Sequence, residues 1–133
     1  SKMTENSDKD ARASKARGIL RGLHANLPEV EASAVITRDG ITVASLLGAE
    51  SNQDRFGAMC ASLLALADRA GQEVDRGALR QVILDGSKGP MLLTQAGDKS
   101  VLAVAANPRA NLGRLILETR KVSVELAALF QAS

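Results

Sequence analysis

The segment from Asp54 to Ala70, which reads DRFGAMCASLLALADRA, constrains the fold more than any other part of the chain. It predicts a helix, because apolar residues recur along it at helical spacing. One stripe consists of Phe56, Met59, Leu63, Leu66 and Ala70. A neighbouring stripe consists of the small residues Ala58, Ala61 and Ala65, extended by Leu64. Because a helix that is apolar on two faces needs two partners, we expect one face on the chain's own sheet and the small-residue face against a helix of a second subunit.

The composition fits one domain with an aliphatic core. Of 133 residues, 45% are hydrophobic and only 2% aromatic, so Leu, Ile, Val and Ala must fill the core. We expect a flexible tail over residues 1–10 and a single domain over residues 11–133. The lone cysteine, Cys60, rules out an intramolecular disulfide, which fits a reducing compartment such as the cytoplasm.

Charge and hydropathy exclude several classes of partner. The net charge of +2 gives no reason to expect nucleic acid or a membrane surface. The near absence of aromatic residues also removes a base-stacking platform. No apolar run approaches the roughly 18 residues of a membrane span, so membrane insertion is not expected.

The periodic segments give an α+β order. Helices are predicted over residues 11–27, 54–70 and 112–131, and Gly71 is the expected end of the second. Strands are predicted over residues 33–38, 41–47, 79–84, 91–95 and 100–106. The strands are joined by short hairpins, so we expect a five-stranded antiparallel sheet with helices on both faces, in the order α-β-β-α-β-β-β-α.

The first hairpin has the clearest turn signal. Asp39-Gly40 is typical of a two-residue turn in which both residues have positive φ. Such a turn would pair Ile36 with Val43 and Val35 with Ala44. Both faces of this hairpin would then be partly apolar, which predicts a sheet covered on both sides.

No group of residues predicts catalysis, a cofactor or a metal. His24 is the single histidine, near the end of a helix, and it has no partner nearby in the sequence that would activate it. Cys60 is expected to be a small buried hydrophobe. Residues 86–89, Gly-Ser-Lys-Gly, resemble the loop that clamps nucleic acid in KH modules, but flanking strands favour a plain hairpin turn. The basic first helix is expected to be a solvated face, and a docking surface for an acidic partner is the second hypothesis.

Several motifs taken in order resemble the Roadblock/dynein light chain family. They are residues 19–23 (ILRGL), 30–40 (VEASAVITRDG), 41–45 (ITVAS), 81–86 (QVILDG) and 102–104 (LAV), with the alanine-rich helix between them. The resemblance covers about residues 17–130. It implies a Roadblock/profilin-like fold and a homodimer that joins central helices and third strands across a two-fold axis.

The resemblance also implies a function, which nothing in composition or periodicity shows. Family members are non-catalytic partners or regulators of Ras-like small GTPases, or subunits of motor and signalling complexes. Bacterial members often work beside a small GTPase, and stimulation of its GTP hydrolysis is one expected activity. The alternative hypothesis is a sensor that holds a small molecule between sheet and helices.

The expected dimer interface combines the small-residue helix stripe with one strand. The strand over residues 79–84 begins a three-strand meander, so one side of it has no hairpin neighbour and pairing with its own copy would cover it. The predicted interface residues are Ala58, Ala61, Leu64, Ala65, Arg80, Val82 and Ile83.

Overall fold

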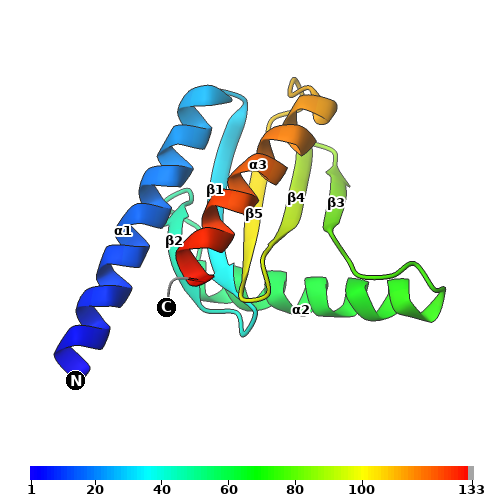
Figure 1. The fold of residues 1–133 in the computed structure, drawn as a ribbon. Helices are drawn as coiled ribbons and strands as arrows, with labels where there is room; N and C mark the ends of the chain where they lie inside the picture. The colour runs from blue at the N-terminus through cyan, green and yellow to red at the C-terminus, as the bar shows by residue number, and fades with distance from the viewer. Residues whose placement is uncertain (132–133) are drawn as a thin grey trace.

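A five-stranded antiparallel sheet separates two helical layers in the computed structural model, which describes residues 1–131. Along the chain the elements are α1 (Lys2–Asn26), β1 (Val30–Thr37), β2 (Thr42–Leu46), α2 (Gln53–Glu73), β3 (Gln81–Gly86), β4 (Gly89–Ala96), β5 (Ser100–Ala106) and α3 (Leu112–Gln131). The strands lie in the order β2-β1-β5-β4-β3. As Figure 1 shows, α1 and α3 lie side by side on one face, and α2 crosses the other. The predicted element order and fold class are confirmed.

Two apolar clusters, one on each face of the sheet, hold the layers together. The larger cluster joins α1 and α3 to the sheet, with Leu20, Leu92, Leu102 and Leu126 fully buried. The smaller one places Cys60 and Leu64 of α2 against the sheet residues Ala34, Ile36, Leu93, Val101 and Ala103. Successive residues from Ser33 to Ile36 are all buried, because β1 is covered on both faces. The expectation of a sheet covered on both sides is therefore correct for its central strands.

The first hairpin differs from its predicted turn. The Gly40 N–H donates to the Thr37 carbonyl oxygen at 2.9 Å, and the Thr37 N–H donates to the Ile41 carbonyl oxygen at 2.8 Å. Three residues therefore form the loop, and within residues 1–131 only Gly40 of the expected pair has positive φ, at 92°. This is the loop class in which a type I turn is followed by a left-handed residue.

A bulge then restores part of the predicted register. Ile36 pairs with Thr42 and not with Val43, and the register shifts between Ile36 and Val35. Val35 consequently faces Ala44, as predicted. The prediction for Ile36 was wrong because Val43 is the extra residue of a β-bulge, a feature that strand periodicity does not reveal.

Two helix ends also lie beyond their predicted positions. α1 begins at Lys2, nine residues before the predicted start at Ala11, and the Ser1 hydroxyl oxygen accepts the Thr4 N–H at 3.3 Å as its cap.

α2 passes through Gly71 and ends at Glu73. The left-handed residue of the C-cap is Asp75, with φ of 57°. The Arg76 N–H donates to the Gly71 carbonyl oxygen at 2.8 Å, and the Asp75 N–H to the Gln72 carbonyl oxygen at 3.0 Å, which is a Schellman motif.

No described helix combines the length and the apolar character needed to cross a bilayer.

Candidate interaction site

α2 is fixed on the sheet at its N-terminal end. The Asn52 side-chain oxygen caps it by accepting the Arg55 N–H at 3.0 Å. Gly57 faces the first hairpin so closely that an added Cβ would lie 2.7 Å from Thr42 Oγ1 and 2.8 Å from the Gly40 carbonyl oxygen. The Thr42 hydroxyl also donates to the Gln53 carbonyl oxygen at 3.0 Å. Glycine at position 57 thus lets the helix backbone touch the hairpin.

The buried line of α2 runs between the two predicted stripes. Gly57, Cys60 and Leu64 are buried against the sheet. Met59 and Leu66, expected on the sheet-facing stripe, are each 62% exposed. Small residues at 57 and 60 bring the helix close to the sheet, so the helix contacts it through this narrow line and leaves both flanks open.

The small-residue stripe lies on the flank beside the first hairpin. A Cβ added to Gly40 would lie 3.1 Å from the Ala58 Cα and 3.5 Å from the Ala61 Cβ. Ala58 and Ala65 are exposed and Ala61 is half-buried, whereas Leu64 belongs to the chain's own core. Leu64 is therefore not available to a partner in this structure.

The opposite flank of α2 carries larger apolar side chains. Helical spacing places Met59, Leu63 and Leu66 together there, and we call these three residues the α2 apolar surface. Leu63 is 37% exposed. Phe56, one turn before Met59, packs against the same cluster as Val82 of β3. The expectation that this stripe lies on the sheet was wrong, because periodicity shows that two faces are apolar but not which line between them is buried.

β3 is the second component of the candidate site. Among residues 1–131 it pairs only with β4, so its outer edge is open in the described structure. Ile83 and Leu84 are 44% and 43% exposed, Arg80 is exposed and Val82 is half-buried. The predicted edge position is confirmed, and the predicted pairing with a second copy stays a prediction.

An arginine-lined groove of about 640 Å³ lies at the start of β3. Its basic side chains are Arg76 and Arg80, from the connection between α2 and β3, and Arg120 of α3. The sequence pattern does not group these three residues, because α3 supplies one of them from forty positions further along the chain.

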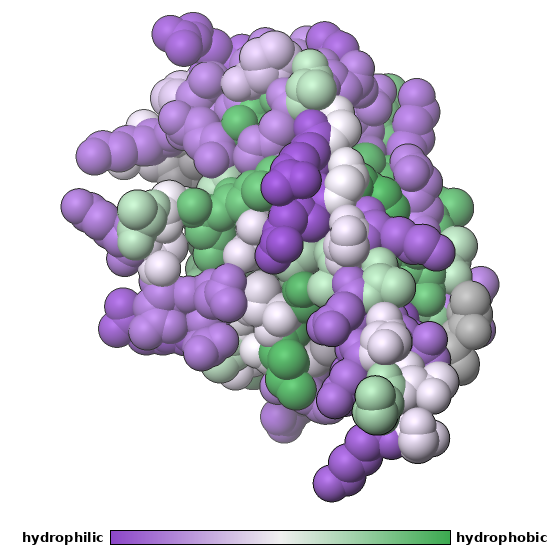
Figure 2. Space-filling model, turned by 90° about the vertical axis from the view of Figure 1, so that its left-hand side faces the viewer, coloured by the Kyte–Doolittle hydropathy of each residue, from purple (hydrophilic) through white to green (hydrophobic). Residues whose placement is uncertain are grey.

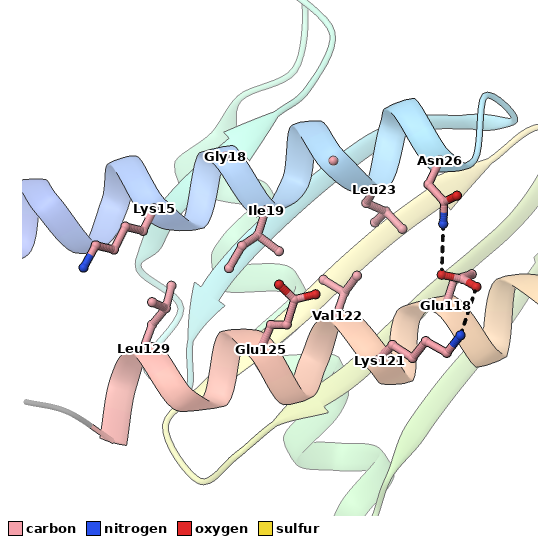
Figure 3. A pocket seen from close by; sticks show the side chains of 11 residues that line it. Lys15, Gly18, Ile19, Leu23, Asn26, Glu118, Lys121, Val122, Glu125 and Leu129 are labelled. Atoms are coloured by element: carbon pink, nitrogen blue, oxygen red, sulfur yellow. Dashed lines mark hydrogen bonds and ion pairs between the residues drawn. The ribbon is translucent and has the colours of Figure 1, made fainter.

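A second groove, of about 610 Å³, separates α1 from α3 (Figure 3). Ile19, Leu23 and Val122 form its apolar floor, and its charged residues are Lys15 of α1 and Glu118, Lys121 and Glu125 of α3. Figure 2 looks onto the α1 side of the molecule, where hydrophilic residues predominate and hydrophobic ones show between them. Part of the basic α1 surface is used within the chain, because the Arg12 guanidinium lies 5.5 Å from the centre of the Phe130 ring.

His24 has a partner that the sequence did not reveal. Its Nε2 lies 2.8 Å from the Ser33 hydroxyl oxygen, which is supplied by β1. Burial lowers the pKa of His24, which favours the neutral ring. Ser33 is only 1% exposed, so its hydroxyl cannot meet a substrate. The pair is a structural contact.

Cys60 behaves as predicted. It is 2% exposed, and burial raises the pKa of its thiol to about 11. A thiol with that pKa stays protonated and is a poor nucleophile.

Within residues 1–131, no three histidine, cysteine or acidic side chains lie together as metal ligands would. Residues 86–89 form the β3–β4 turn, as the hairpin hypothesis required.

The comparison with known families agrees with this architecture. A model described as Roadblock/LC7 domain matches residues 17–106, more than half of the chain. The chain belongs to the Roadblock/LC7 family.

Relatives of this Roadblock/LC7 protein are distant in sequence. It is 28% identical to the uncharacterized protein MJ1340 of Methanocaldococcus jannaschii over 101 residues, which are 76% of this chain and 88% of the relative. Among solved structures, the gliding protein MglB from Thermus thermophilus matches with a TM-score of 0.81 and 16% identity, over 92% of this chain and 93% of that one. Profilin IA from Acanthamoeba castellanii matches with a TM-score of 0.55 and 20% identity, over 79% and 93%. These structures show a shared fold.

Proposed function

We propose that this Roadblock/LC7 protein is a non-catalytic homodimer that acts in the cytoplasm as an adaptor or regulator of a Ras-like small GTPase. The observation that carries the proposal is the family match over residues 17–106. The fold shared with the gliding protein MglB supports the family assignment on which the proposal rests. The family resemblance described above supplies the GTPase as the expected partner.

The open edge of β3 and the α2 apolar surface support the dimer. An apolar edge strand is a hazard unless it is covered or paired, and pairing with its own copy removes the hazard. Met59 and Leu66, each 62% exposed, would be covered if the two α2 helices also met. We therefore keep Arg80, Val82 and Ile83 in the proposed interface and add the α2 apolar surface to it. The predicted alanines, Ala58, Ala61 and Ala65, remain the competing helix contact.

The sensor hypothesis has less support in this structure. It calls for a closed apolar cavity between the layers. The two grooves of about 610 and 640 Å³ lie instead between α1 and α3 and at the β3 edge, and charged side chains line both. Their shape and lining suit a protein partner better than a small apolar ligand.

The test measures GTP hydrolysis by a purified Ras-like GTPase from the same organism, with and without this protein. We expect the wild type to bind the GTPase and to change its hydrolysis rate, and Leu66→Glu to lose the effect if the dimer is the active unit. Met3→Glu is the matched control, because Met3 is 82% exposed in the first turn of α1, an element outside both proposed contacts. A wild type that binds no GTPase and has no effect on hydrolysis contradicts the proposal.

A further inference from the structure

The arginine-lined groove carries a positive charge that no acidic side chain among residues 1–131 neutralises. Arg76, Arg80 and Arg120 line it, and no aspartate or glutamate does. The Arg76 Nε donates to the Val74 carbonyl oxygen at 3.0 Å. Within residues 1–131, no carboxylate lies within 4.0 Å of an Arg80 or Arg120 side-chain nitrogen, since the one ion pair joins Lys121 to Glu118 at 3.6 Å. Guanidinium groups bind carboxylates well, so this groove suits an acidic side chain from outside the chain.

The opposite end of β3 carries such a side chain. Asp85 is exposed and has no ion-pair partner among the described residues. Its direction follows from Gln81, whose side-chain amide donates to Thr94 Oγ1 at 2.8 Å and to Thr119 Oγ1 of α3 at 3.2 Å. Since alternate residues of a strand share a face, Asp85 points to the α3 side of the sheet, as Gln81 and Ile83 do. The strand is thus basic near its start and acidic near its end.

Two-fold pairing of β3 with its copy would bring the two ends together. In an antiparallel strand pair, directly opposite residues point to the same face of the sheet. When a two-fold axis perpendicular to the sheet relates two copies of β3, opposite residues are therefore an even number of positions apart, and the axis lies at a residue and not between two residues. With the axis at Ile83, Asp85 of the second copy faces Gln81, and with the axis at Leu84 it faces Ile83. Both Gln81 and Ile83 line the arginine groove. A parallel pairing would instead set like charges beside each other.

We propose that the arginine-lined groove is the receptor for Asp85 of a second copy of this chain, so that two such contacts fix the register of the β3–β3 pair. The inference rests on the homodimer proposed above and adds the residues that select its register and direction. Exposed ion pairs contribute little to stability one at a time. A carboxylate that enters this basic groove discriminates between correct and incorrect pairings, because wrong registers leave like charges together.

The experiment measures the dimer dissociation constant by sedimentation for a set of charge variants. Asp85→Arg adds a fourth cation to each groove and should weaken the dimer about tenfold or more. Asp98→Arg makes the same charge change in the exposed β4–β5 turn and should leave the constant unchanged. Asp85→Arg combined with Arg80→Glu and Arg120→Glu exchanges the charges and should recover most of the lost affinity. Thermal unfolding of each variant checks that it is folded.

The outcomes separate this inference from the dimer itself. A wild type that stays monomeric at high micromolar concentration overturns the dimer and the contact together. A dimer that Asp85→Arg and Asp98→Arg weaken equally leaves the homodimer standing and rejects the Asp85 contact. A charge exchange that does not recover affinity, in folded protein, rejects it as well.

Discussion

At the scale of single residues, His24 and Ser33 show what nearby sequence leaves out. His24 lies in α1 and Ser33 in β1, and the turn between these elements brings their polar atoms to 2.8 Å. Neighbouring positions along the chain could not reveal this contact, because it depends on how α1 packs on the sheet. Cys60 needed no such contact, so residue type and apolar neighbours were enough to predict its buried state.

The burial of His24 makes stability depend on pH in a defined direction. Burial lowers the pKa of His24 in the folded state, so near pH 6.5 the unfolded chain binds more protons than the folded one. Stability is therefore full above about pH 6.5 and falls as pH drops from there through the lower folded-state pKa. We expect His24→Gln to remove much of this fall in the melting temperature between neutral and mildly acidic pH. An unchanged pH profile in His24→Gln would show that other groups cause the loss.

At the scale of elements, the ends of helices and hairpins were the least predictable features. The order of helices and strands followed from periodicity, because β-branched runs and helical stripes are properties of the local sequence. The end of α2 could not be predicted from periodicity. The left-handed residue that ends the helix is Asp75, whereas the sequence pattern placed the end at Gly71. The bulge at Val43 could not be predicted from the pattern either. The three-residue loop shifts the strand register by one position and the bulge shifts it back, so the predicted pairing of Val35 with Ala44 is unchanged.

Asp75 offers a test of the C-cap. Its φ of 57° costs a side-chain-bearing residue about 1 kcal/mol relative to glycine. We expect Asp75→Gly to raise the free energy of unfolding by about 0.5–1 kcal/mol, and Asp75→Ala to lower it. Chemical denaturation of the three proteins measures the difference, at a protein concentration where the oligomeric state is fixed. A loss of stability in Asp75→Gly would mean that the aspartate side chain contributes more than the backbone strain costs.

At the scale of the whole molecule, the proposed dimer depends on which flank of α2 meets a partner. The sequence predicted two apolar stripes on α2 with one of them on the sheet, whereas in the structure the buried line runs between the stripes. It could not predict the rotation of the helix on the sheet, which the close contacts at Gly57 determine. The proposed interface therefore moves from the alanine stripe to the α2 apolar surface on physical grounds, because larger exposed side chains lose more contact with water on burial.

Two neighbouring glutamate substitutions distinguish the flanks. Leu66→Glu would bury an unpaired charge in the proposed interface and should dissociate the dimer. Ala65→Glu changes an exposed residue on the other flank and should leave the dimer intact. Light scattering coupled to size-exclusion chromatography gives the mass of each variant. The reverse result would restore the alanine stripe as the helix contact.

The close approach of Gly57 to Thr42 and Gly40 has a mechanical consequence for any protein that binds α2. With no room for even a methyl group at this contact, the helix cannot slide or roll on the sheet without displacing the tip of the first hairpin. A protein that presses α2 against the sheet would therefore also press on Thr42 and Gly40 of the first hairpin.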